Sequence, residues 1–315
     1  MKVFDSLLAF YVNQLDNLDQ RLYAQLYSVS WGRDIKLRTG LTMSDESTSF
    51  MRTVISAIGT NSATGKPWIG PKTTTLPGVS IDGDRIVAPI RLLGREISYN
   101  SVELMRSQRL GAPIDQQKFA AFNTMYQMDT DEMAYIGDTV VGAKGLVNSS
   151  LVGVAGVTAD GTGNSPLWST KTADQILRDV NDMLAAAWLA SGYAVCPDKL
   201  LLPPTKFAYI VGQKVSTAGN MSILEYIKQN SLCLSTNGRP LDVQPCKWLT
   251  NRGVGGAIDR MVAYSNQEEF VRFPMVPVQR ETPYYLGINF NAPYLWAYGE
   301  VEMPRPETLL YRDGI

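Results

Sequence analysis

The sequence of 315 residues contains no histidine. This absence excludes Ser-His-Asp and Cys-His catalysis, zinc sites with histidine ligands and histidine pH switches. Only three cysteines are present, Cys196, Cys233 and Cys246, and they form no C-x-x-C pair. That pattern argues against a disulfide framework and a cysteine-only zinc site, so we interpret the three as buried thiols in a reducing compartment.

Long apolar runs and an excess of one charge are also lacking. No run approaches the ~20 apolar residues that span a bilayer, and the N-terminus has no small-residue cleavage site of a signal peptide. The net charge of −1 provides no global field that would attract nucleic acid. With 45% hydrophobic residues the chain can bury a sizeable core. We expect a soluble protein made in a cytoplasm, with no membrane partner.

Known catalytic motifs are missing, and we predict no cofactor. A proline follows Gly65-Lys66 where a phosphate-binding loop needs a hydroxyl. The densest carboxylate cluster is Asp129, Asp131 and Glu132, near the C-terminal end of a predicted helix, where the dipole disfavours negative charge. These groups could form a solvated or charge-paired face, hold a divalent ion or act as acid and base. We favour pairing with Arg or Lys from elsewhere in the chain or from another subunit.

Apolar residues in the first segment are spaced by alternate steps of four and three, which indicates an amphipathic helix with one stripe. They are Phe4, Leu8, Tyr11, Leu15, Leu18 and Leu22. The stripe either packs on its own domain or forms an arm that docks on another subunit or partner. A membrane-surface helix is disfavoured, because only Lys2 and Arg21 could meet acidic lipid.

Residues 56–84 are rich in Gly, Pro, Ser and Thr and lie between strand-like runs at 50–55 and 85–90. This pattern predicts a long protruding hairpin whose tip holds Lys66, Trp68 and Lys72. Because an isolated hairpin is marginally stable in water, it needs a neighbouring surface. The alternative is a flexible surface loop.

Five arginines follow in and after the second strand: Arg85, Arg91, Arg95, Arg106 and Arg109. They could contact phosphates, but interleaved glutamates and the lack of an aromatic platform favour ion pairs between subunits.

The rest of the chain predicts a mixed α and β domain. A long helix is expected over 112–138, with an apolar stripe of Ile114, Phe122, Met125, Tyr126, Met133 and Ile136 and an end near Gly137. A capping box at Thr172–Gln175 predicts a second helix. Further expected elements are a buried strand at 199–202, helices near 205–212 and 222–230, and strands at 260–264, 269–273, 284–290, 294–298 and 309–311, with prolines at edges and turns.

Several short motifs add to this order of elements. They are LGAPID (110–115) and YIGD (135–138) around the long helix, GLVN (145–148), LLPPTKF (201–207), MPRP (303–306) and DGI (313–315). Together they resemble the major capsid proteins of tailed double-stranded DNA bacteriophages, whose Hong Kong-type fold is shared with encapsulins.

The resemblance implies an α+β fold in five segments. These are an N-terminal arm (1–33), an extended hairpin region (34–111), a first part of the peripheral domain with the spine helix (112–170), an axial α/β domain (171–255) and a β-rich second part of the peripheral domain (256–315). The chain starts directly at the arm, so we expect a separate scaffolding protein instead of a fused assembly domain.

The implied function is a virion subunit, made in the host cytoplasm, that self-assembles as hexamers and pentamers into an icosahedral head around double-stranded DNA without reading its sequence. Portal and scaffolding proteins are expected partners, with decoration proteins as a further candidate. The assembly hypothesis covers the arm stripe, Lys66, Trp68, Lys72, Arg85, Arg91 and the three carboxylates. Alternatives are an encapsulin-like compartment and a carboxylate-dependent enzyme.

Overall fold

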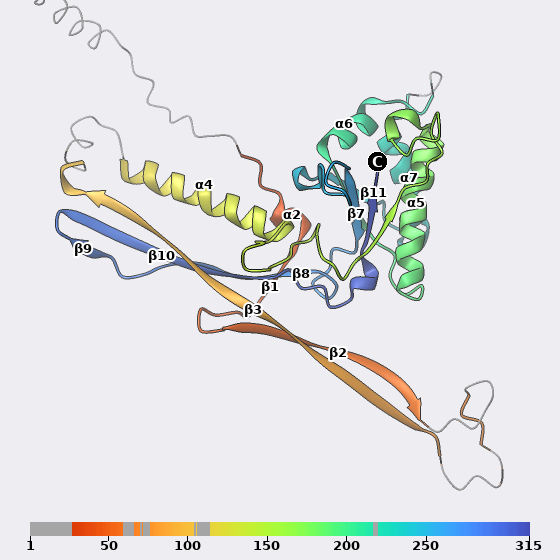
Figure 1. Ribbon diagram of the computed structural model, residues 1–315, viewed down its shortest axis with the longest axis horizontal. Coiled ribbons are helices and arrows are strands. Elements are labelled where there is room, and N and C mark those ends of the chain that lie inside the picture. Colours follow the sequence, from red (N-terminus) through yellow and green to blue (C-terminus); the bar gives the residue numbers. More distant parts are fainter. Residues whose placement is uncertain are drawn as a thin grey trace, which may run out of the picture. The chain divides into compact units, whose positions relative to one another are not determined.

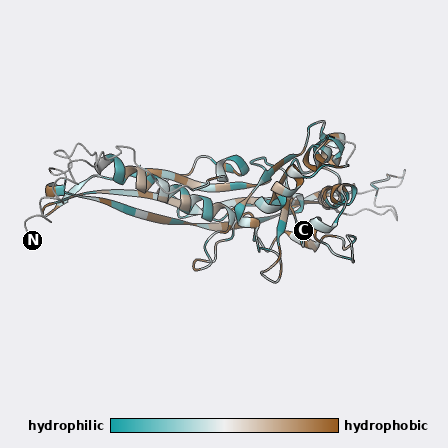
Figure 2. Cartoon of the chain, turned by 90° about the horizontal axis from the view of Figure 1, so that it is seen from above, coloured by the Kyte–Doolittle hydropathy of each residue, from teal (hydrophilic) through white to brown (hydrophobic). Residues whose placement is uncertain are grey.

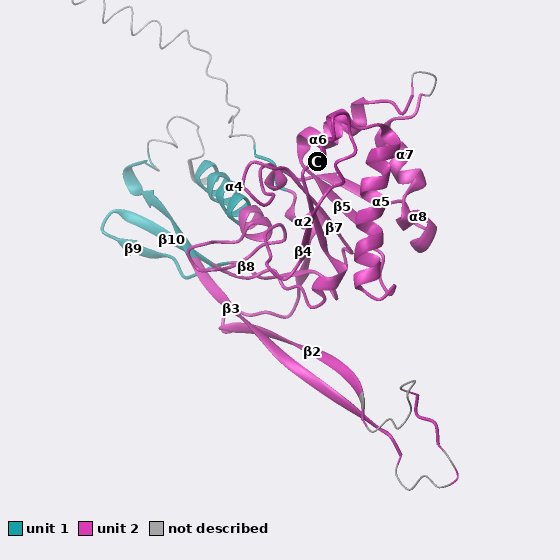
Figure 3. Ribbon diagram, turned by 45° about the vertical axis from the view of Figure 1, so that its right-hand side comes forward, with its two compact units in different colours: residues 1–29, 94–129, 279–295 teal, residues 30–93, 130–278, 296–315 magenta. Residues whose placement is uncertain are grey.

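The computed structural model describes residues 27–58, 66–69, 71, 76–103, 105, 114–216 and 220–315. The chain is divided into two compact units, each built from separate stretches of sequence (Figure 3). The smaller unit contains Met1–Val29, Gly94–Asp129 and Gln279–Leu295, and the larger contains Ser30–Leu93, Thr130–Val278 and Trp296–Ile315. Helices and sheets both contribute to the chain (Figure 1), which confirms the predicted α+β class.

A five-stranded sheet forms the α/β part of the larger unit. Its order is β4 (Gly153–Gly156), β11 (Leu310–Asp313), β7 (Arg260–Tyr264), β5 (Lys199–Leu202) and β6 (Asp242–Pro245). Strand β11 is parallel to β4 and antiparallel to β7, and β5 is antiparallel to β7 and parallel to β6. Strands β5 and β7 are buried at every position. They therefore lack the alternation of a half-exposed strand, as expected for a sheet covered on both faces.

The predicted helices of this part are confirmed as α5 (Ala173–Ala190), α6 (Pro204–Gly212) and α7 (Ile223–Asn230), followed by α8 (Leu232–Asn237), which was not predicted. Helix α5 starts with the predicted capping box, in which the Thr172 side chain accepts from the Gln175 N–H and the Gln175 side chain accepts from the Thr172 N–H. The helices and the sheet enclose one core, which includes Trp168, Ile176, Val180, Met183, Leu184, Leu200, Leu202, Ile227, Met261 and Ile315.

The second sheet has the order β1 (Lys36–Arg38), β8 (Arg272–Arg280), β10 (Asn289–Gly299), β3 (Gly78–Asn100) and β2 (Ser47–Ile58), and β9 (Tyr284–Leu286) pairs with β10. Strands β1 and β8 are parallel and pair Lys36 with Arg272. Hydrophobic residues, brown in Figure 2, occur along the strands of this second sheet as well as in the α/β part.

The predicted strand at 269–273 was wrong. Residues before Arg272 form a turn, in which the N–H groups of Phe270 and Val271 both donate to the Gln267 carbonyl at 3.0 Å. The strand instead runs through two prolines inside the sheet. Gly299 on β10 leaves room for the ring of Pro274, because a Cβ there would lie 2.8 Å from the proline Cγ.

The single strand predicted at 284–290 was also wrong. Strand β9 ends at Leu286, Gly287 adopts a left-handed φ of +62°, and β10 begins at Asn289. The antiparallel pairing of Asn289 with Leu286 closes a tight hairpin around this glycine. The apolar residues on both sides hid the turn from sequence reasoning.

The long helix is confirmed as α4 (Ile114–Tyr135). It ends as predicted, because Gly137 has a left-handed φ of +75° and a Cβ there would overlap the Ala143 carbonyl. Of the predicted stripe, Phe122 and Tyr126 are buried, but Met125 is 50% exposed and does not belong to it. The remaining short elements are α2 (Trp31–Asp34), η1 (Trp168–Thr170), η2 (Lys247–Leu249) and η3 (Pro306–Thr308). Among the described helices, none has the length and apolar character needed to cross a bilayer.

Candidate assembly surfaces and a buried charge cluster

The predicted hairpin is confirmed and is longer than expected. Strands β2 and β3 pair continuously from Ser47 opposite Pro89 to Ile58 opposite Gly78. In Figure 1 the two strands twist around each other as a ribbon. Of the tip residues named from the sequence, Lys66 and Trp68 are exposed, whereas Lys72 lies outside the described residues.

Apolar side chains are exposed along this ribbon. They are Met51, Val54, Ile55, Ile58, Val79, Ile81 and Val87, each more than half exposed, and Trp68 in the tip is 77% exposed. Exposed apolar side chains gathered in this way mark an interaction site. The ribbon is therefore the strongest candidate for contact with another molecule.

The base of the ribbon is fixed by a buried carboxylate. The Glu302 side chain is 1% exposed and lies 2.5 Å from Arg38 Nη1 and 2.6 Å from Arg272 Nε. Arg272 also lies over the Phe50 ring of β2, and Arg52 Nε donates to the Pro304 carbonyl at 3.3 Å. Strands β1, β2 and β8 are thus tied to the segment after β10.

The smaller unit has its own exposed apolar surface, at the β9–β10 turn. Tyr285, Leu286 and Ile288 are each more than 60% exposed. Beside them is a cavity of about 450 Å³ lined by Tyr99, Asn100, Ser101, Arg280, Tyr285, Ile288 and Phe290. This turn is a second candidate contact surface.

The five arginines have different environments. Arg85 and Arg91 are exposed on β3, and Arg95 pairs with Asp129 at 2.8 Å. Arg106 and Arg109 lie outside the described residues, as do all six residues of the arm stripe, Phe4, Leu8, Tyr11, Leu15, Leu18 and Leu22.

The three clustered carboxylates do not converge. Asp129 contacts Arg95, Glu132 is exposed and Asp131 is fully buried. Burial raises the pKa of Asp129 although Arg95 opposes the shift. Within the described residues no three His, Cys, Asp or Glu side chains gather in a metal site. The carboxylate-dependent enzyme required these groups to act together, and this geometry does not favour it.

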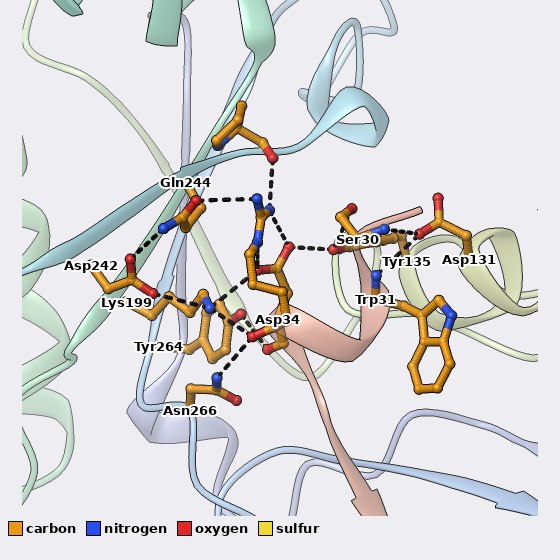
Figure 4. A network of polar contacts seen from close by, with 12 residues as sticks. Ser30, Trp31, Asp34, Asp131, Tyr135, Lys199, Asp242, Gln244, Tyr264 and Asn266 are labelled. Atoms are coloured by element: carbon orange, nitrogen blue, oxygen red, sulfur yellow. Dashed lines mark hydrogen bonds and ion pairs between the residues drawn. The ribbon is translucent and has the colours of Figure 1, made fainter. Parts of the chain in front are cut away.

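Asp131 instead holds the beginning of α2. Its Oδ1 accepts the backbone N–H groups of Ser30 at 2.9 Å and Trp31 at 3.1 Å. Its Oδ2 accepts from Trp248 Nε1 at 2.8 Å and lies 3.0 Å from Lys247 Nζ. These contacts satisfy an acidic group that the helix dipole of α4 disfavours, and they place Ser30 beside α4 (Figure 4).

Asp34, at the other end of α2, is the centre of a buried charge cluster (Figure 4). Its carboxylate accepts from Arg33 Nε at 2.7 Å and lies 3.1 Å from Lys199 Nζ. The Tyr135 hydroxyl donates to the same carboxylate, and the Tyr264 hydroxyl donates to the Asp34 carbonyl at 2.6 Å. Burial raises the pKa of both tyrosines, so that the hydroxyls stay protonated and remain donors.

The cluster extends from α2 to strands β5 and β6. Lys199 Nζ lies 3.1 Å from Asp242 Oδ2 and donates to the Arg33 carbonyl at 2.9 Å. Arg33 donates to Gln244 Oε1 at 3.1 Å and to the Pro245 carbonyl at 2.9 Å. The last residues of the predicted arm, together with Asp34, are therefore attached to α4 and to the α/β sheet at once. Sequence reasoning missed this cluster, and its only signal was Lys199 directly before a run of three leucines.

The three cysteines are free and buried, as predicted. Burial raises the pKa of the Cys246 thiol to about 12 and that of Cys196 to about 11, from an ordinary value near 9. The thiols are therefore neutral at physiological pH and poorly reactive.

Cys246 is expected to make the fold sensitive to alkali. Above pH 9 the thiol ionises in the unfolded chain but not in the folded one, so the free energy of unfolding falls as pH rises toward 12. The loss is about 1.4 kcal/mol per pH unit in this window. Urea unfolding of the wild type and Cys246→Ala between pH 8 and about pH 10.5 measures it. Parallel pH profiles of the two proteins would contradict the prediction.

The architecture, with its exposed ribbon and apolar turn, is the fold of solved phage and particle capsids. The capsid of Myoviridae phage XM1 matches with a TM-score of 0.75 and 16% identity over 96% of this chain and 98% of that chain. The capsid of a native GTA particle matches with a TM-score of 0.61, 11% identity and coverage of 95% and 94%. The capsid of Ralstonia phage GP4 matches with a TM-score of 0.57 and 12% identity, over 95% of this chain and 94% of that chain.

The chain belongs to the major capsid protein family, whose family model matches residues 65–315. The predicted Hong Kong-type fold and the predicted role as a structural subunit of a virion shell are confirmed. A search of curated proteins found no match. The encapsulin-like compartment is not favoured, although a virus-like particle from Pyrococcus furiosus shares the fold with a TM-score of 0.50 and 13% identity over 89% of this chain and 90% of that chain.

Proposed function

We propose that this capsid protein assembles as hexamers and pentamers into an icosahedral head that encloses double-stranded DNA. Membership of the major capsid protein family and the likeness to phage capsids support the proposal. The observation that carries it is the β2–β3 ribbon, whose apolar side chains are exposed along its length. A single copy leaves them in water, and neighbouring copies can cover them.

The mechanism is adhesion distributed over many copies. The ribbon and the arm of 1–33 lie on neighbouring subunits and bury apolar surface there, while the last arm residues, Ser30 to Arg33, stay bound to their own subunit. At ~25 cal/mol per Å² of apolar area, a contact of about 1,600 Å² is ample even after the cost of association. A net charge of −1 suits this mechanism, because identical copies with a large net charge repel one another.

The proposal also includes the predicted segments, the predicted partners and the structural role. The five segments 1–33, 34–111, 112–170, 171–255 and 256–315 remain our proposed division of the chain. Separate scaffolding and portal proteins, decoration proteins and packaged DNA remain proposed partners. The role is structural and not catalytic, a proposal that the separation of Asp129, Asp131 and Glu132 supports.

Removing the ribbon tests the proposal. Because Phe50 pairs with Ile86, residues 51–85 can be replaced by Asn-Gly, a two-residue turn that closes a short hairpin. We expect a folded protein, since most of the described side chains that are removed are exposed and only the Arg52 bond to the Pro304 carbonyl is lost among the contacts given above, and we expect no shells in electron micrographs. Circular dichroism and thermal unfolding provide the control for folding. Normal shells from this variant would remove the ribbon from the mechanism.

A further inference from the structure

The register of the β2–β3 ribbon gives it two chemically different faces, because directly paired residues of a sheet share a face and the next pair lies on the other. The first, which we call face A, holds Met51, Thr53, Ile55, Val79, Ile81, Gly83, Arg85 and Val87. The second, face B, holds Phe50, Arg52, Val54, Ser56, Ile58, Ser80, Asp82, Asp84 and Ile86, of which Phe50 and Ile86 are half-buried at the base of the ribbon.

Side-chain contacts agree with this division. A Cβ at Gly83 would lie 3.5 Å from Met51 Cε and 3.6 Å from Thr53 Cγ2, so these three residues meet on face A. On face B the Ser56 and Ser80 hydroxyls are hydrogen-bonded across the strands at 2.6 Å. The two faces are therefore separate surfaces of one ribbon.

The faces differ in what they offer to a partner. On face A, Ile55 and Ile81 pair directly and are 73% and 69% exposed, and Arg85 is the one charged side chain of that face within the described ribbon. Face B carries Asp82 and Asp84 opposite Val54 and Arg52, and two serines. A partner can bury face A without burying an unpaired carboxylate. Burying face B would also bury Asp82 and Asp84, at a cost in desolvation.

We propose that face A binds an apolar surface of a second copy of this chain, and that the part of face B beyond Arg52, with Val54, Ser56, Ser80 and Asp82, remains in contact with water in the shell. The inference rests on the proposed function and adds the side of the ribbon that is covered. A second copy is the occupant because the chain belongs to the major capsid protein family and because the capsid of the native GTA particle, which shares the fold, has copies related by C5 symmetry. Because Arg85 also lies on face A, we expect the surface of the second copy to offer its guanidinium an acceptor oxygen.

Adjacent residues of β2 offer a matched test. Val54 and Ile55 are both β-branched, are 62% and 73% exposed, and lie on faces B and A. Ile55→Lys places a charge on the proposed contact, and Val54→Lys places the same charge on the opposite side. Since both side chains are exposed, we expect both variants to unfold at the wild-type temperature.

Assembly of the purified protein is followed by light scattering and electron microscopy as a function of protein concentration. For Val54→Lys we expect shells to appear at the same protein concentration as for the wild type. For Ile55→Lys we expect either no shells or a protein concentration for assembly that is roughly tenfold higher, because the added charge must be desolvated in the contact. Ile55→Val retains an apolar side chain and should restore assembly.

Three results would overturn the inference. Equal effects of the two lysine variants would show that the faces do not differ, and a larger effect of Val54→Lys would show that face B is covered. Normal assembly of Ile55→Lys by itself, with a defect only when an added scaffolding protein is present, would place another protein on face A. In each case the variant lacking residues 51–85 tests the proposed function separately.

Discussion

Replacing Asp34 by alanine is expected to lower the free energy of unfolding by about 3–5 kcal/mol. The substitution leaves Lys199, which is 3% exposed, with only the half-exposed Asp242 as a counter-charge. It also removes the acceptor for Tyr135 and Arg33. Chemical denaturation with linear extrapolation measures the change.

Two controls separate the loss of charge from the loss of packing. Asp82→Ala removes an exposed aspartate of the ribbon and is expected to change stability little. The double variant Asp34→Asn with Lys199→Met removes both charges, and it is expected to recover part of the loss because no buried charge is stranded. A change below about 1 kcal/mol for Asp34→Ala would show that Asp34 is not the counter-charge on which the buried Lys199 depends.

Replacing Glu302 by alanine is the second change with a large expected effect, again a loss of about 3–5 kcal/mol. Its 1% exposed side chain neutralises Arg38 and Arg272 together, so both guanidinium groups lose their counter-charge. Hydrogen exchange should also rise at the base of β2, where Arg38 Nη2 donates to the Ser49 carbonyl.

Glu307→Ala provides the matched control. Glu307 lies 3.7 Å from Arg305 in a pair whose side chains are 38% and 55% exposed, and surface pairs of this kind contribute about 0–1 kcal/mol. If the Glu302 and Glu307 variants unfold alike, the base of the ribbon is not held by charge.

The sequence predicted those helices and strands whose ends are set by residues close to them in the chain. The capping box at Thr172–Gln175 identified the start of α5, and the Gly- and Pro-rich stretch between two apolar runs identified the ribbon. Prolines misled the prediction of β8, because the room for the Pro274 ring comes from Gly299 on another strand. No pattern near residue 274 carries that information.

The assembly surface was predictable only in part. The ribbon was found, but its division into two faces depends on the register that places Ile55 opposite Ile81. The charge cluster was not found, because Asp34 meets Lys199 and Tyr135 only after distant segments of the chain have folded together. Likewise the sequence placed Asp129 and Asp131 in one group, and the fold sends them to different cations.

The pairing of Gly153 with Leu310 has a consequence for biosynthesis. Strand β4 emerges from the ribosome long before β11, the strand that lies between it and β7. Strand β4 therefore has no partner in this sheet until β11 has been made, about 150 residues later, and contacts of such long sequence separation form slowly.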